Sequence, residues 1–174
     1  MKLNPMRARR IIAVAVLLLV AFLIVCPPLA NGGVKVTLSS SPPVGVEHLY
    51  VTIREISVHR ADTREPEGWF VMTNQSRQID LSAVNSSQTV GLGSASLGQY
   101  DMIRVRVTNA TAILNNTSKR VQLPSSVFTV PFSFLVRLGV QTVIMLKVAP
   151  ELEETPEAMS LRLSFTAVPM ASAA

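Results

Sequence analysis

Apolar and polar residues alternate along most of the chain after residue 30, which is the pattern of β-strands with one buried face. The clearest stretches are Val34–Leu38, Ile103–Val107 and Leu161–Phe165, where apolar residues alternate with Lys, Thr, Arg or Ser. No window of this region sustains a helical period, although Pro150–Met159 has room for one short turn. The pattern therefore predicts an all-β protein.

One segment changes its parity partway along. Leu49–Ile53 and Ile56–Val58 place their apolar residues on opposite faces of a regular strand. A β-bulge near Arg54-Glu55 would return both sets to the same core. We therefore predict one long strand with a bulge at this position.

Further strands are predicted at Trp69–Met72, Ile79–Leu81, Val121–Leu123, Val127–Val136 and Gln141–Val148. Pro131 within an apolar run predicts an edge strand or a bulge, whereas the almost uninterrupted run Gln141–Val148 predicts a central strand. The short segment Ile79–Leu81 is a candidate edge. Seven to nine such strands indicate a single antiparallel β-sandwich, prealbumin-like or Ig-like, over residues 33–169, with 170–174 as a short tail.

The N-terminal region has a different composition. The apolar run Ile11–Val25 is followed by Cys26-Pro27-Pro28. The four basic residues before it are Lys2, Arg7, Arg9 and Arg10. This order is typical of a secretory signal, and the basic residues stay in the cytoplasm. A 15-residue run makes a helix of about 22 Å, shorter than a bilayer core of about 30 Å. Residues 1–32 are thus either a signal peptide cleaved at Ala30-Asn31-Gly32 or an N-terminal membrane anchor.

Charge and cysteine content support this division of the chain. Four of the 16 Lys and Arg residues lie in the leader, and the other 12 almost balance the 11 Asp and Glu residues. The net charge of +5 therefore does not indicate a nucleic-acid-binding protein. Cys26 is the only cysteine, so the exported part has no disulfide. A bacterial or archaeal source fits better than an animal secretory pathway.

Five of the seven asparagines begin an Asn-x-Ser/Thr sequon: Asn74, Asn85, Asn109, Asn115 and Asn116. This is a large excess over chance, and such sequons are acceptors for glycans in exported proteins. We expect N-glycosylation of exposed loops.

No catalytic or metal-binding constellation emerges from the residue types. His48 and His59 stand eleven residues apart on one strand, so they cannot share a metal ion. Gly91–Gly98 indicates a Gly/Ser connection rather than a phosphate-binding loop, because no helix follows it. The acidic residues Glu151–Glu157 indicate a solvated connection. We expect a protein that is not an enzyme and has no cofactor.

Four arginines alternate with core residues and are expected to point outward: Arg54, Arg104, Arg106 and Arg162. If their strands share one sheet, this face is a basic platform for an anionic glycan or a partner protein. The alternative is a solvated face on which the arginines pair with acidic residues across strands.

Several short motifs, in order, resemble one family. They are Val34–Leu38 (VKVTL), Leu49–Arg60 (LYVTIREISVHR), Gly68-Trp69, Ile79–Leu81 (IDL), Gly91–Gly93 and Gly98–Val105 (GQYDMIRV). Segments of the type V-x-V-T-I-x-x-I-E-V-H and G-x-Y-x-x-I-R-L typify the domain-of-unknown-function 4382 family. The resemblance spans about residues 34–168 and implies a secreted or membrane-attached prokaryotic β-sandwich without an established activity. Ser40–Pro43 stands where members often have T-D-A-P, so no role for that acidic residue transfers.

These observations predict an exported cell-surface domain with a structural, adhesive or binding role. Its partners would be the membrane, through the N-terminal segment, and a surface protein or glycan. One alternative is a subunit of an extracellular assembly, in which Asn31–Lys35 or Met170–Ala174 adds a strand to a neighbour. Another is a carbohydrate-binding module with a row of exposed aromatic residues at Tyr50, Trp69 and Tyr100.

Overall fold

The computed structural model describes residues 31–41, 45–83, 87–154 and 158–170, which form strands and no helix. The strands are β1 (Asn31–Ser40), β2 (His48–Arg60), β3 (Trp69–Thr73), β4 (Arg77–Asp80), β5 (Gln88–Ser96), β6 (Gly98–Leu114), β7 (Thr117–Val121), β8 (Val127–Val136), β9 (Gln141–Glu154) and β10 (Met159–Pro169). The all-β prediction is confirmed. Residues 1–30 of the predicted N-terminal segment 1–32 and residues 171–174 of the predicted tail 170–174 lie outside the described residues, whereas Asn31 and Gly32 belong to β1.

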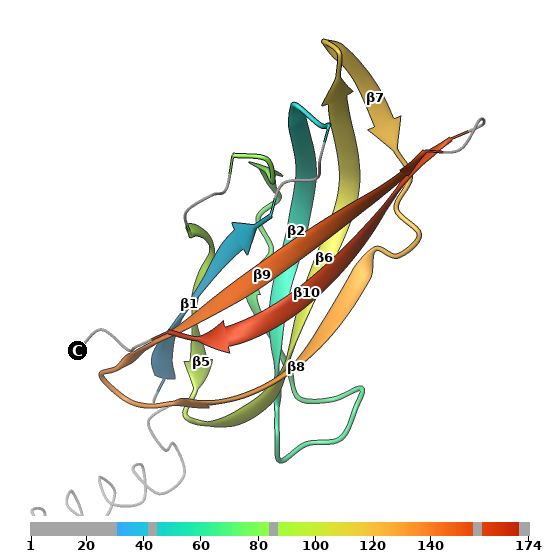
Figure 1. Ribbon diagram of the computed structural model, residues 1–174. Helices are drawn as coiled ribbons and strands as arrows, with labels where there is room; N and C mark the ends of the chain where they lie inside the picture. The colour runs from blue at the N-terminus through green and yellow to red at the C-terminus, as the bar shows by residue number, and fades with distance from the viewer. Residues whose placement is uncertain (1–30, 42–44, 84–86, 155–157, 171–174) are drawn as a thin grey trace, which may run out of the picture. The chain divides into compact units, whose positions relative to one another are not determined.

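The strands form two sheets (Figure 1). One has the order β10-β9-β1-β5, and the other has β3-β2-β6-β7, with β4 also paired to β2 and β8 also paired to β6. The expectation of a purely antiparallel fold is wrong at one pair, because Gly33–Ser40 of β1 runs parallel to Gln141–Val148 of β9. Parallel neighbours need a crossover connection, and here all the strands from β2 to β8 lie between the two in sequence.

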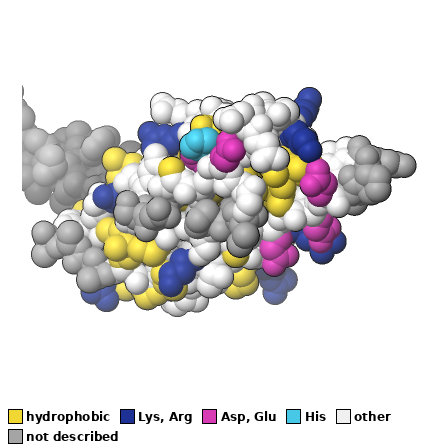
Figure 2. Space-filling view, turned by 45° about the horizontal axis from the view of Figure 1, so that its top comes forward, with side chains coloured by type: hydrophobic (Ala, Val, Ile, Leu, Met, Phe, Trp, Pro, Cys, Tyr) yellow, Lys and Arg dark blue, Asp and Glu magenta, His cyan; other side chains and the backbone are white. Residues whose placement is uncertain are grey.

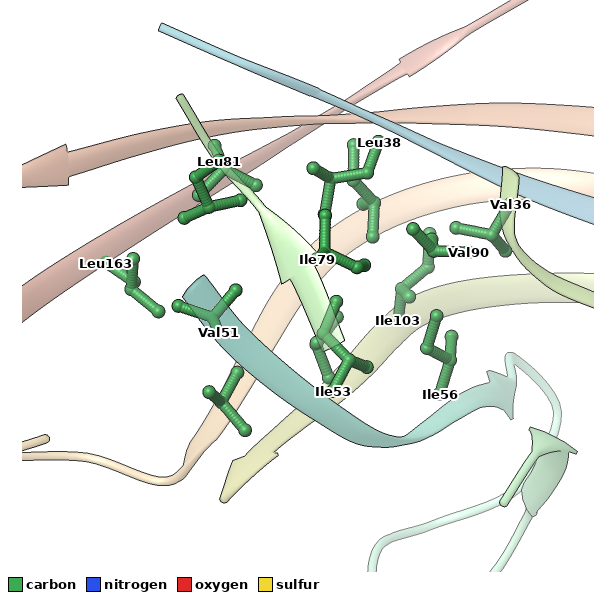
Figure 3. Packing of buried hydrophobic residues seen from close by; sticks show 14 of the residues in the cluster. Val36, Leu38, Val51, Ile53, Ile56, Ile79, Leu81, Val90, Ile103 and Leu163 are labelled. Carbon is green, nitrogen blue, oxygen red and sulfur yellow. The ribbon is translucent and has the colours of Figure 1, made fainter. Parts of the chain in front are cut away.

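Both sheets contribute to one hydrophobic core (Figure 3). Val36 and Leu38 point into it from β1, while Ile53 and Ile103 come from the opposite sheet. These side chains are almost completely buried. The alternating residues predicted to face inward therefore do so, because each strand has one face on this core.

The predicted bulge in β2 is confirmed. The pairing of β2 with β6 shifts register between Ile53 and Glu55, and both Ile53 and Ile56 are buried. The extra residue lets two apolar sets of opposite parity reach the same core. A second prediction also holds, because the register of β8 against β6 shifts next to Pro131. Pro131 lies opposite Met102, and Phe134 lies opposite Tyr100.

The Gly/Ser segment is a strand and not a connection. Residues 88–96 form β5, which pairs with β1, and Gly93 lies opposite Val34. A Cβ atom at Gly93 would lie 2.6 Å from the carbonyl oxygen of Met72 in the other sheet. Glycine is therefore used here for the close approach of two backbones, which local sequence does not reveal.

The helical turn suggested for Pro150–Met159 is not present in the described part of that segment. Pro150 lies inside β9, opposite Leu163 of β10, and the pairing continues to Glu154. The prediction that Gln141–Val148 is a central strand is confirmed, because β9 has β1 on one side and β10 on the other. None of the described residues belongs to a helix that could span a membrane.

Candidate functional site

Three of the motifs that resemble the family meet on the outer face of the six-stranded sheet. His59 is near the end of β2, and Trp69 at the start of β3 is its register partner. Arg104 comes from β6, the neighbour of β2 on the other side, where it lies opposite Ser57. We call His59, Trp69 and Arg104, with Asp101 and Glu65, the histidine cluster.

His59 is at the centre of this cluster and is only 2% exposed. Its Nδ1 atom lies 2.8 Å from Oδ1 of Asp101, and its ring centroid lies 5.0 Å from that of Trp69. Gly68 has a φ of 78°, and a Cβ atom there would lie 3.3 Å from Nε2 of His59 and against the side chain of Thr63. Glycine therefore lets the chain enter β3 directly above the imidazole.

Arg104 stacks on the ring of Trp69. The guanidinium carbon lies 3.6 Å from the indole centroid, and Nη2 donates to Oε1 of Glu65 at 3.1 Å. Such a stacked and paired guanidinium stabilises the aromatic ring beneath it. Glu65 belongs to the β2–β3 loop, so Arg104 also ties this loop to the sheet.

The cluster contains the Asp–His pairing seen in hydrolytic triads, with the imidazole almost completely buried. Nε2 of His59 is buried without a hydrogen-bond partner among the described residues. The nearby hydroxyl of Thr63 donates to the carbonyl oxygen of Arg60 at 2.8 Å, so it is already engaged. A nucleophile–base pair requires a hydroxyl or thiol within hydrogen-bond reach of the imidazole. The arrangement can hold the β2–β3 loop on the sheet.

The loop itself is closed by backbone hydrogen bonds. The amide of Arg60 donates to the carbonyl oxygen of Gly68 at 2.9 Å, and the amide of Ala61 donates to that of Gln99 at 2.9 Å. Asp62 pairs with Nε of Arg60 at 2.7 Å. The loop predicted from the polar run Arg60–Gly68 is therefore an ordered cover over His59.

The four arginines of the suggested platform do not share one sheet. Arg54, Arg104 and Arg106 are in the six-stranded sheet, whereas Arg162 is in β10 and pairs with Glu153 at 3.1 Å. Arg106 lies opposite Glu55. In the face shown in Figure 2, Lys and Arg side chains are spread among other side chains instead of forming one patch.

The sequon asparagines that the structure describes are all exposed. Asn74 lies between β3 and β4, while Asn115 and Asn116 form the β6–β7 turn with φ values of 50° and 57°. Asn109 differs from the expectation of a loop, because it lies within β6. Asn85 is outside the described residues.

The acidic run is mostly strand. Glu151, Glu153 and Glu154 belong to β9 and are exposed, and Glu154 accepts a hydrogen bond from Nζ of Lys119 at 3.0 Å. Glu157 lies outside the described residues. Within the described part of the chain, no group of three or more His, Cys, Asp or Glu residues is placed to hold a metal ion.

The three aromatic residues suggested for a carbohydrate-binding module do not form an exposed row. Tyr100 is completely buried, and its hydroxyl donates to the carbonyl oxygen of Ser96 at 2.9 Å. Burial raises the pKa of the Tyr100 phenol above its ordinary value of 10.0. Tyr50 stacks on His48 at 5.6 Å, away from the histidine cluster. The tyrosine at position 100 is therefore a core residue.

An open groove of about 710 Å³ was not predicted from sequence. It lies between β6, the end of β7 and the start of β10, and its lining includes Asn109, Arg120, Gln122 and Met159. The amide of Gln122 donates to the carbonyl oxygen of Met159 at 2.8 Å, which joins the two sheets beside the groove. The position of this groove depends on contacts between distant strands, so local patterns carry no signal for it.

Comparison with known proteins agrees with the ordered motifs. A family model described as a domain of unknown function (DUF4382) matches residues 31–153. No curated protein and no solved structure matches the chain. The matched region begins with β1, contains the whole histidine cluster and ends within β9.

Proposed function

Because the chain belongs to the domain-of-unknown-function 4382 family, we propose that it is an exported, non-enzymatic cell-surface protein with a structural or binding role. A β-sandwich built on the two described sheets would be its extracellular part. The N-terminal segment would direct its export and attach it to the membrane.

The observation that carries this proposal is the order of the segments along the chain. Basic residues precede the apolar run Ile11–Val25, and β1 begins six residues after that run, at Asn31. A segment with this charge order keeps its N-terminal end in the cytoplasm and sends the C-terminal part of the chain across the membrane. The whole of the described domain would then be outside.

The start of β1 favours an anchor over cleavage after Gly32. Gly32 is buried and pairs with Ala95 of β5, and a Cβ atom there would collide with the carbonyl oxygen of Arg137. Cleavage after Gly32 would remove Asn31 and Gly32 from an inner strand of the sheet. Retention of residues 1–30 keeps this strand complete.

The exposed sequons support an extracellular location. Glycans are bulky and need surface positions, and Asn74, Asn109, Asn115 and Asn116 all have exposed side chains. Asn109 also lines the groove of about 710 Å³. A glycan on Asn109 would stand at the rim of this groove, and a partner that approaches this surface would meet the glycan.

Fractionation combined with intact-mass analysis tests the proposal. The full chain, produced in a prokaryotic host with an N-glycosylation pathway, should sediment with membranes and be digested by protease added to intact cells. Its mass should include residues 1–30 and one or more glycans. A protease-protected protein of unmodified mass in the cytosolic fraction would contradict both the export and the glycosylation.

Assembly by strand addition is a second candidate, but one of its suggested donors is excluded. Asn31–Lys35 already pairs within its own sheet, with β5 along its length and with β9 from Gly33 onward. The outer strands of this sheet in the described part of the chain are β5 and β10, and β10 is bridged to Gln122 at Ser160. Removal of Met170–Ala174, of which residues 171–174 lie outside the described part of the chain, should abolish oligomers on native gels if this segment is the donor.

A further inference from the structure

Exposed apolar side chains gather at one end of the domain. Leu135 is 45% exposed, Leu138 is 67% exposed and Met170 is 37% exposed. Together with Val140 and Pro169 we call them the apolar tip. Large exposed apolar patches on a protein surface mark sites that meet another protein or a membrane.

Three chain segments build this tip. The β8–β9 turn carries Leu138, and the end of β10 carries Met170, whose amide donates to the carbonyl oxygen of Val143 at 3.2 Å. The start of β1 lies at the same end of the domain (Figure 1), where Gly33 pairs with Gln141. The backbone of Gly32 also lies directly against Arg137 of the turn.

A hollow of about 310 Å³ opens between these segments. Its apolar lining includes Phe132, Leu135, Val140 and Met170, and Arg137 lies beside them. Arg137 is exposed and forms no ion pair with any other described residue. The tip thus combines exposed apolar side chains with one available cation, as in protein segments that lie at a lipid interface.

The chain between the apolar run and the domain is short. Six residue steps separate Val25, the last residue of that run, from Asn31. Their fully extended reach is at most about 22 Å. If Ile11–Val25 is embedded in a bilayer, Asn31 is held within this distance of Val25, and the tip adjoins the start of β1.

We propose that the apolar tip rests on the lipid bilayer that holds the N-terminal segment. Leu135, Leu138 and Met170 would enter the boundary between headgroups and acyl chains, and Arg137 would pair with lipid phosphates. This inference rests on the proposed function, because it needs residues 1–30 to be retained as an anchor. Lipid fits better than a second copy because a retained anchor with so short a tether would hold this end of the domain close to the membrane.

Site-specific fluorescence of the full chain in vesicles tests the inference. In a Cys26→Ser background, Leu138→Cys and the control Val71→Cys each carry one polarity-sensitive fluorophore; Val71 is 55% exposed on β3. The proteins are reconstituted into phosphatidylcholine–phosphatidylglycerol vesicles with and without doxyl-labelled lipid. The label at 138 should show blue-shifted emission and lose intensity with doxyl lipid, whereas the label at 71 should do neither.

The outcomes separate this inference from the proposed function. If the chain does not float with the vesicles, the anchor is wrong and the inference fails with it. If it floats but the labels at 138 and 71 behave alike, the inference alone is wrong. If the label at 138 is shifted without quenching, and the shift grows with protein density, a second copy covers the tip and the lipid contact is refuted. Both substitutions are at exposed positions, and unchanged Trp69 emission of the two variants before labelling would confirm folding.

Discussion

Gly93→Ala tests the place where the edges of the two sheets approach each other. The new Cβ atom would lie 2.6 Å from the carbonyl oxygen of Met72 and 3.0 Å from its Cε atom. Close carbon–oxygen contacts in proteins are about 3.3–3.6 Å. The methionine side chain can move, but its backbone is held in β3, so the strands must separate by about 0.7 Å or more.

The expected cost follows from two opposing terms. Overpacking of this kind destabilises a fold by about 1–3 kcal/mol. Replacing glycine also restricts the unfolded chain, which returns about 0.4–1 kcal/mol. We expect Gly93→Ala to lower the free energy of unfolding by about 1–2 kcal/mol.

Urea denaturation followed by the fluorescence of Trp69, the only tryptophan, measures this change. Gly33→Ala in the neighbouring strand is the matched control, because its Cβ atom would lie 3.7 Å from the nearest atom, in Gln141. That variant should be as stable as the parent or slightly more stable. Equal stability of the Gly93 and Gly33 variants would refute the close approach of β3 and β5.

Three further substitutions, two of them paired with a control substitution, test polar side chains of the six-stranded sheet. His59→Ala should lower the free energy of unfolding by about 2–4 kcal/mol because it empties a buried site. The control His48→Ala, at the exposed end of the strand, should lower it by less than about 1 kcal/mol. Equal urea midpoints of the two variants would contradict this difference. Arg104→Lys should cost about 1 kcal/mol and shift tryptophan emission, since the stacked guanidinium is lost, while Arg106→Lys should do neither. The raised pKa of Tyr100 means that the folded state holds its proton more tightly, so stability is complete below about pH 10 and falls as the pH rises above it. Tyr100→Phe should cost about 1 kcal/mol at neutral pH but remove most of this alkaline loss in thermal melts; an unchanged alkaline slope would assign the loss to other groups.

Local patterns predicted the strands well because burial on one face of a strand repeats every two residues. The bulge near Arg54-Glu55 was visible for the same reason, since two apolar sets of opposite parity had to reach one core. Pro131 also signalled its irregularity, because proline cannot donate to a strand ladder. Each of these features is set by a residue and its immediate neighbours.

The histidine cluster could be predicted only in part. The residues that resemble the family, among them His59, Trp69 and Arg104, were visible in the sequence, but nothing local indicated that they meet. They come together because β2 has β3 on one side and β6 on the other. The separation of Arg162 from the other three arginines has the same origin, since sheet membership depends on which distant strands pair.

The sequence by itself determined the all-β class, the inward faces of the strands and the order of a basic stretch, an apolar run and one domain. Only the tertiary structure decided the parallel pairing of β1 with β9, the strand at Gly91–Gly93 and the apolar tip beside Asn31. The physical reason is the separation along the chain of the residues that interact. Side-chain burial repeats locally along a strand, whereas backbone hydrogen bonds and close approaches join residues far apart in the chain, and no local pattern records their partners.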